Sequence, residues 1–291
     1  MPLPVNPLLS DQTGLGDTRA VTRPVTGELV LSVFPGVGLL DRGFESAGFC
    51  VVRGPDKIFG GDVKKFFPPA GCFAGVIGGP PCQKFSLVNR KRDVAGGMDL
   101  VNEFVRIVEA SGPAWALMEN VPGSPVIEIP GFLAQLFTLN SSHVGSEQNR
   151  LRKFHFFYRA GSRELVVGRS SAGVTVPACL ATEARRAGRR SWRDFCRLQG
   201  LPDDFDLPAF KVGEKFRAVG NGVPFALALA LALAIRNRAR AVTPLRVCGC
   251  GCGQFVKGRA LTAGPACRKR EQRKRDARPV DLLPAASQME F

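Results

Sequence analysis

The chain of 291 residues carries 40 Lys or Arg against 25 Asp or Glu, which gives a formal net charge of +15. With 45% hydrophobic and 22% charged residues, it has the composition of a folded globular protein and not of a disordered chain. Its nine cysteines are odd in number and unevenly spaced, so they do not fit a disulfide framework and favour a reducing cytoplasm.

The sequence shows no membrane signal. Its first 17 residues lack the basic start and apolar run of a signal peptide. The longest apolar run, residues 223–235, is too short to span a bilayer. We therefore expect a cytoplasmic protein with no membrane partner.

The N-terminal half predicts an alternation of strands and helices. Residues 1–27 are rich in Pro, Thr and Gly and predict a flexible arm. Short apolar runs predict strands, and runs with helical spacing predict helices, the first of which ends near Gly48. The strands are 28–34, 49–53, 73–79 and 114–123, and the helices are 39–48 and 98–112. This alternation predicts an α/β fold with a doubly wound, mostly parallel sheet, in which ligands bind beyond the carboxyl ends of the strands.

One segment satisfies two patterns. Residues 226–234 alternate between Ala and Leu, which is the period of a strand. Ala and Leu are nevertheless the best helix formers, and no β-branched residue occurs before Ile235. We predict a buried helix.

Two turns follow predicted strands. "GVIGGPPCQKFS" (75–86) presents Cys82 on a stiff Gly-Gly-Pro-Pro turn, either as a positioned nucleophile or as a buried structural thiol. "FPGVG" (34–38) lets backbone amides around Gly36 approach a ligand at a helix N-terminus, although a plain tight turn fits equally well.

Three charged residues and one asparagine are candidates for chemistry. Glu119 follows the apolar "AWALM", so burial should raise its pKa and suit it to donate a proton near neutral pH, unless it is a capping or salt-bridged residue. Arg150 and Arg152 are two apart in a predicted strand, so both should lie on one face, to bind a planar acceptor or as an exposed basic face. Asn221, between glycines and just before a helix, can bond backbone or ligand.

Taken in order, six stretches of residues 28–236 resemble the DNA (cytosine-5)-methyltransferase family. They are "FPGVG", "PPCQKFS", "ENV", "QNRLR", "RDFCRLQGLPDDF" (193–205) and "GNGVP". The resemblance implies a Rossmann-like fold that binds S-adenosylmethionine and acts, as a monomer, on a cytosine flipped out of duplex DNA. It implies that the Cys82 thiolate adds to ring carbon 6, that Glu119 protonates ring nitrogen 3, and that Arg152 holds the base with Arg150 close by.

The alternatives are a transfer-RNA cytosine-5 methyltransferase and a catalytically silent DNA-binding relative. A Cys-Phe-Thr tripeptide of the transfer-RNA branch is missing, and the intact Cys82, Glu119 and Arg152 argue against a silent protein.

The resemblance also implies a set of cofactor contacts: Phe34, Gly36, Gly38, Asp56, Asp62, Pro80, Asn221 and Val223. Asp56 is a displaced candidate, because the second strand runs "VVRGPD" where the family has an acidic residue that holds the ribose. The target-recognition region, about residues 159–190, is shorter than is usual in the family and predicts a short target. It offers arginines for phosphates or guanine edges, at 185, 186, 189 and 190.

The C-terminal tail is basic and rich in cysteine. Residues 236–278 hold thirteen Lys or Arg against two acidic residues, which suits contact with DNA phosphates or a merely solubilising tail. Cys248, Cys250, Cys252 and Cys267 predict a structural zinc site, with a disordered tail of free thiols as the alternative. The expected domains are a 1–27 arm, a 28–158 catalytic core, the 159–190 recognition region, a 191–242 return to the core, a 243–278 zinc-binding basic tail and a 279–291 disordered end.

Overall fold

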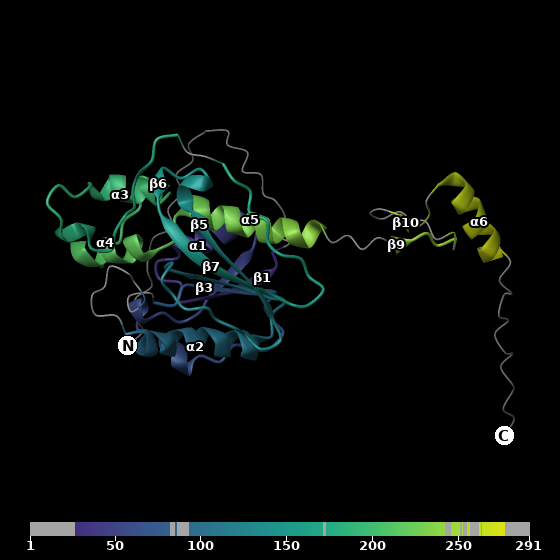
Figure 1. Cartoon of the computed structure of the whole chain (residues 1–291), viewed down its shortest axis with the longest axis horizontal. Coiled ribbons are helices and arrows are strands. Elements are labelled where there is room, and N and C mark those ends of the chain that lie inside the picture. The colour runs from purple at the N-terminus through teal and green to yellow at the C-terminus, as the bar shows by residue number, and fades with distance from the viewer. Residues whose placement is uncertain are drawn as a thin grey trace, which may run out of the picture.

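The computed structural model describes residues 27–81, 85, 93–170, 173–241, 246–250, 252, 255–256, 262 and 264–276. Its centre is a six-stranded sheet in the order β2-β1-β3-β4-β7-β5 (Figure 1). These strands are β1 (Leu29–Val33), β2 (Cys50–Arg53), β3 (Gly75–Gly78), β4 (Trp115–Asn120), β5 (Leu133–Asn140) and β7 (Leu151–Tyr158). The first four run parallel, and β7 is antiparallel to both of its neighbours.

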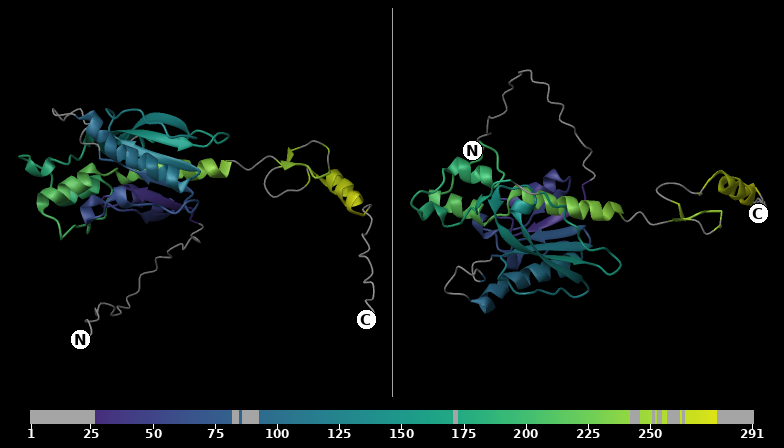
Figure 2. Two further views of the ribbon diagram at one scale, coloured as in Figure 1. Left: turned by 90° about the horizontal axis from the view of Figure 1, so that it is seen from below. Right: turned by 45° about the horizontal axis from the view of Figure 1, so that its top comes forward.

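Helices cover both faces of this sheet. On one face, α1 (Leu39–Ser46) and α5 (Phe225–Ala241) pack with Phe44 and Leu231 in a shared apolar cluster. On the other face, α2 (Val94–Ser111) contributes Phe104 to a second cluster. Figure 2 shows α2 and the α1–α5 pair on opposite sides of the strands. The predicted doubly wound α/β fold is confirmed.

The segment with two competing patterns is a helix, as predicted. Leu227, Leu231 and Ile235 of α5 recur at the four-residue spacing of one helical face and are buried. Gly43 of α1 lies against the same helix, where an added Cβ would be 2.5 Å from the backbone of Ala228. Glycine at 43 therefore permits the close crossing of α1 and α5.

The apolar character of α5 has a packing explanation. Among the described residues, Val212–Arg238 is the one stretch long and apolar enough, by length and composition, to cross a membrane. It consists of α4 (Val212–Asn221) and most of α5, separated by residues 222–224, and half of its most apolar window is buried. Core helices pass the same test, and α5 contributes its apolar face to the core.

A smaller unit packs beside the carboxyl ends of the parallel strands. There α3 (Trp192–Leu198) and α4 bury Phe195 against Phe216, with ring centroids 4.6 Å apart. Further along the chain, β9 (Arg246–Val247) and β10 (Phe255–Val256) form an antiparallel pair, and α6 spans Pro265–Asp276. The short elements are β6 (Gln148–Asn149), β8 (Val176–Pro177), η1 (Lys57–Phe59), η2 (Val63–Lys65), η3 (Ser141–His143) and η4 (Glu183–Arg185).

The predicted boundaries differ in detail from the structure. The first helix ends at Ser46, and Gly48 follows with a φ of 90°, which glycine adopts without strain. The helix predicted over 98–112 begins earlier, at Val94, because the Asp93 side chain caps it by accepting from the Gly96 amide at 2.9 Å.

Candidate active site

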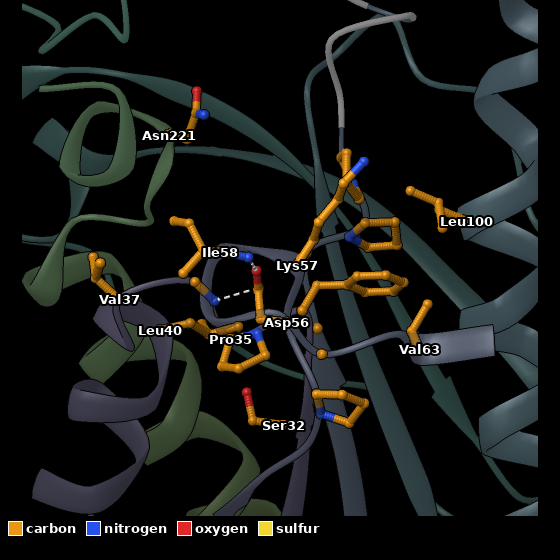
Figure 3. Close-up of a pocket in the computed structure, with 18 of the residues that line it drawn as sticks. Ser32, Pro35, Val37, Leu40, Asp56, Lys57, Ile58, Val63, Leu100 and Asn221 are labelled. Carbon is orange, nitrogen blue, oxygen red and sulfur yellow. Dashed lines mark hydrogen bonds between the residues drawn. The ribbon is translucent and has the colours of Figure 1, made fainter. Parts of the chain in front are cut away.

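A cavity of about 780 Å³ opens at the carboxyl ends of β1, β3 and β4. Its lining includes seven of the eight predicted cofactor residues: Phe34, Gly36, Asp56, Asp62, Pro80, Asn221 and Val223. Figure 3 shows the lining, with apolar side chains such as Val37, Leu40 and Val63 around the Asp56 carboxylate. The topology thus brings together residues that lie up to 189 positions apart in the chain.

Gly38, the eighth predicted residue, lies outside the cavity lining. Its φ is 78°, and an added Cβ would be 2.8 Å from a guanidinium nitrogen of Arg53. Gly38 is the N-cap residue of α1. Its left-handed backbone conformation and its missing side chain allow the chain to pass close to the Arg53 guanidinium.

Asp56 links the first turn of the cavity to the loop after β2. Its Oδ2 accepts a hydrogen bond from the Gly36 amide at 2.8 Å, and its Oδ1 accepts one from the Ile58 amide at 2.8 Å (Figure 3). The turn that it holds includes Phe34, whose φ of 58° is unusual for a residue other than glycine. A neighbouring carboxylate, Asp62, caps η2 by accepting from the Lys64 amide at 3.0 Å.

The end of β2 is occupied by a cation and not by an acid. Arg53 donates from Nε to Asp41 Oδ2 at 2.8 Å, and Ser32 donates to Asp41 Oδ1 at 2.6 Å. Burial raises the pKa of Asp41, against the opposing effect of its hydrogen bonds to Ser32 and Arg53. Asp41 is therefore engaged within the protein, and the carboxylates on the cavity wall are Asp56, Asp62 and Glu119.

Glu119 lies on the cavity wall, one residue before the carboxyl end of the buried strand β4. Its Oε1 accepts from Arg152 Nε at 2.8 Å. Burial raises the pKa of Glu119, as predicted, while the charges of Arg152 and Arg150 oppose that rise. A Cβ at Gly79 would lie 3.1 Å from Glu119 Oε2, so the glycine leaves room for this carboxylate.

The pairing of two antiparallel strands brings Arg152 to Glu119. Residue 119 of β4 stands opposite Phe154 of β7, and Arg152 is the diagonal neighbour two residues away. Arg152 also donates to the Leu151 carbonyl at 2.9 Å, which fixes its guanidinium. The carboxylate and guanidinium together form a polar wall suited to the edge of a planar heterocycle.

Arg150 does not lie in the strand with Arg152, contrary to the sequence prediction. It falls between β6 and β7, so the alternation of side chains along a strand does not apply to it. Its buried guanidinium donates to the carbonyls of Cys179 (2.6 Å), Gly220 (2.6 Å) and Gly222 (3.0 Å). These contacts hold the junction between α4 and α5.

Two buried glutamines continue this network, and the sequence analysis did not single them out. Gln148 Nε2 donates to the Leu198 carbonyl and, at 2.9 Å, to Gln199 Oε1, while its Oε1 accepts from the Cys179 amide at 2.9 Å. Gln199 in turn donates to the Val219 carbonyl at 2.5 Å. Gln148 belongs to "QNRLR" and Gln199 to "RLQG", two of the stretches that carry the family resemblance. Their place in these stretches is the sequence feature that could have indicated a role for them.

Cys82 lies outside the described residues. The two prolines that precede it, Pro80 and Pro81, line the cavity beside Glu119. Asn120, next to Glu119, donates to the Pro80 carbonyl at 3.4 Å. The turn that leads to Cys82 is thus tied to the strand that carries Glu119.

The recognition-region arginines separate into two pairs. Arg190 contacts both carboxylate oxygens of Glu183 at 2.8 Å, and Arg189 donates to the Ala184 carbonyl at 2.8 Å. Arg185 and Arg186 are exposed, and within the described part of the chain neither side chain has a hydrogen bond or an ion pair. The second pair is available to a ligand.

The four tail cysteines converge, as predicted. The Sγ atoms of Cys248, Cys250, Cys252 and Cys267 all lie within 4.8 Å of one another. Cys248 and Cys250 are 3.4 Å apart, and Cys252 and Cys267 are 3.8 Å apart. Such a group of thiols can hold a metal ion.

Comparisons with known proteins identify the class of fold. A structure from an E. coli prophage, assigned to DNA modification methyltransferases, matches 73% of this chain and 99% of its own at 18% identity and a TM-score of 0.51. The Entamoeba histolytica methyltransferase EhMeth matches 75% of this chain and 99% of its own at 13% identity and a TM-score of 0.57. The chain shares the Rossmann-like fold of these methyltransferase structures.

Sequence comparisons then show a similarity to one family. Residues 61–124 match the family model described as C-5 cytosine-specific DNA methylase. The Type II methyltransferase M.HgiDI of Herpetosiphon aurantiacus is 35% identical over 97 residues, which is 30% of this chain and 31% of that protein. M.NgoPII of Neisseria gonorrhoeae is 31% identical over 147 residues, 43% of this chain and 38% of that protein. The matches thus span about a third of these relatives' length, and residues 61–124 of this chain are similar to the C-5 cytosine-specific DNA methylase family.

Proposed function

We propose that this protein transfers a methyl group from S-adenosylmethionine to carbon 5 of cytosine in duplex DNA. The observation that carries the proposal is the buried Glu119 on the cavity wall, ion-paired with Arg152 and next to the prolines that precede Cys82. A carboxyl group with a raised pKa keeps its proton to a higher pH than an exposed one, which suits it to give that proton to ring nitrogen 3 of a bound cytosine. The Arg152 guanidinium orients that ring.

The remaining step falls to Cys82. Its thiolate forms a bond to carbon 6 and breaks the double bond between carbons 5 and 6, which makes carbon 5 nucleophilic. Carbon 5 takes the methyl group, and loss of its proton then expels the thiolate and restores the double bond. Pro80 and Pro81 restrict the backbone conformations of the segment that leads to this residue.

The residues around the cavity fit the proposed cofactor. S-adenosylmethionine combines an apolar purine, a ribose with two hydroxyl groups, and a positive sulfonium that supplies the methyl group. Val37, Leu40 and Ile58 offer apolar surface, and the volume lies within the range of ligand pockets. Asp56 is the carboxylate placed to accept from ribose hydroxyl groups, since Arg53 and Asp41 are paired with each other. We assign Asp62 to the purine side.

The test is covalent trapping on duplex DNA that carries 5-fluorocytosine, because fluorine at carbon 5 blocks the final elimination. With cofactor present, we expect an adduct that survives denaturation. Cys82→Ser should abolish it, and Cys72→Ser, which removes an exposed thiol elsewhere, should not. An adduct that persists in Cys82→Ser, or methyl transfer to transfer RNA but not to duplex DNA, would contradict the proposal.

The setting of the activity is proposed from the relatives. M.HgiDI and M.NgoPII are bacterial Type II methyltransferases. By analogy we propose a cytoplasmic enzyme that acts as a monomer and modifies DNA in the manner of a restriction-modification system.

We further propose that the four tail cysteines hold a zinc ion. A tetrahedral site with Zn–S bonds of about 2.3 Å places its sulfur atoms about 3.8 Å apart. The separations of 3.4 Å for Cys248–Cys250 and 3.8 Å for Cys252–Cys267 are close to this geometry. Elemental analysis should find about one zinc per chain, lost in Cys250→Ser and retained in Cys72→Ser. Protein without zinc would contradict this assignment and leave the methyltransferase proposal untouched.

A further inference from the structure

The helix α6 begins at the cysteine cluster and is strongly basic. Cys267 lies in its first turn, and its Sγ is 3.8 Å from that of Cys252. Between Pro265 and Asp276 the helix carries six Lys or Arg residues against two acidic ones. A short helix with so many like charges is unfavourable by itself and needs an external stabilising contact.

The described part of the tail has one apolar cluster, and its members are the cysteines themselves. Cys248 and Cys250 are buried, with Cys252 and Cys267 packed against them. A cluster of four thiols buries too little surface to fix a hairpin and a helix. A metal ion bound by all four would join the β9–β10 pair to the start of α6.

The positions of α6 separate into two faces. At 3.6 residues per turn, Cys267 and Glu271 share one face, and both are half-buried. Lys269 and Arg273 fall on the opposite face, Arg270 lies on the flank between the two faces, and all three are exposed. Anchoring the helix through Cys267 therefore leaves these three cations exposed along one side of α6, from that flank to the opposite face.

We propose that this outward face of α6, defined by Lys269, Arg270 and Arg273, contacts the phosphate backbone of duplex DNA. The bound metal holds the face in position. The argument for DNA as occupant is charge complementarity: three neighbouring cations on one helical face match a row of phosphates, and they carry no means of reading bases. The inference rests on the proposed function for the identity of the nucleic acid and on the zinc site for the anchor.

The experiment measures the salt dependence of binding. Fluorescence anisotropy with a labelled duplex and no cofactor compares the full chain with a K269A/R270A/R273A variant between 50 and 200 mM salt. Three lost phosphate contacts reduce the slope of log K against log salt by about 2.7, so the wild-type advantage in affinity should shrink about 40-fold across this range. The control is Lys65→Ala, which removes an exposed cation of the core and should leave the slope unchanged.

A second variant tests the anchor. Cys267→Ser should lose the zinc found by elemental analysis and reproduce the reduced slope, with the charges of α6 still present. An unchanged slope in the triple variant would overturn the inference, and so would an unchanged slope in Cys267→Ser with its metal gone. A larger effect of the triple variant on single-stranded RNA than on duplex DNA would overturn the choice of partner. Because no methyl transfer occurs in this assay, a failure of the catalytic proposal would appear only in the trapping experiment.

Discussion

Arg150 is expected to act by positioning the cofactor cavity and not by touching the base. Its guanidinium donates to the carbonyls of Cys179, Gly220 and Gly222, and the last two flank Asn221, which lines the cavity. A substitution at 150 should therefore loosen the α4–α5 junction first. Arg152, two residues away, is paired with Glu119 and should affect the chemical step instead.

The three contacts set the expected size of the effect. A hydrogen bond from a charged donor contributes about 1.5–3 kcal/mol, so Arg150→Met, which removes all three, should lower the free energy of unfolding by about 4 kcal/mol or more. Arg150→Lys keeps the charge and can reach one or two of the carbonyls, so we expect about half of that loss. One weakened contact at the cavity wall, worth about 1.4 kcal/mol, raises the cofactor Kd about tenfold.

The assay separates binding from chemistry. For Arg150→Lys, calorimetry should show the weaker cofactor binding, while kcat at saturating cofactor changes little. The matched variant Arg152→Lys should show the reverse: an unchanged cofactor Kd and a kcat lowered by about 10²–10⁴-fold. Arg150→Lys with normal stability, a normal cofactor Kd and a lowered kcat would refute the reasoning and return Arg150 to the catalytic role implied by the resemblance.

Three other predictions follow from the site and its surroundings. Because burial raises the pKa of Glu119, its contribution to stability is complete below the unfolded pKa and is lost as pH rises through the folded pKa. Glu119→Gln should therefore be at least as stable as wild type at pH 8 yet lose most methyl transfer; an equal destabilisation at pH 5 and pH 8 in thermal melts would contradict this. Arg186→Gln should lower the salt slope of DNA binding by about one with no loss of stability, whereas Arg190→Gln should destabilise by about 1–3 kcal/mol, because it leaves the buried Glu183 carboxylate without its partner. The short recognition region predicts a target of about two to four base pairs, and a fixed six-base context in bisulfite sequencing would count against it.

Local patterns in the sequence were sufficient to predict the sheet and the burial of Glu119. Apolar runs that end in glycine or proline gave the starts of β1, β3 and β4 to within one or two residues, because each strand is buried on both faces. Helix propensity decided α5 correctly, since burial at four-residue spacing is compatible with an Ala-Leu alternation. Glu119 follows a fully buried strand, so its desolvation was visible in the sequence.

The roles of two charged residues could not be predicted in this way. The strand prediction through Arg150 failed because β6 ends at Asn149 and the chain turns there, with the Arg150 amide donating to Asn140 Oδ1 at 2.9 Å. The partner of Arg53 was equally hidden. Only the parallel pairing of β1 and β2 brings the end of β2 over α1, where Asp41 meets Arg53.

The contacts that join "QNRLR", "RLQG" and "GNGVP" depend on the kind of atom that each side chain binds. Gln148, Gln199 and Arg150 donate mainly to backbone carbonyls, of Leu198, Val219, Cys179, Gly220 and Gly222. Every residue has a backbone carbonyl, so these contacts do not depend on the side chains of the residues that accept. They depend instead on the path of the backbone, which must place the accepting carbonyls within reach of the three donors. The recognition region enters between the first two stretches, and Gln148 and Arg150 both contact it at Cys179. A change in its length that keeps Cys179 in place leaves these contacts intact. The α4–α5 junction, which carries Asn221 and Val223, then keeps its position at the cofactor cavity when the recognition region changes length.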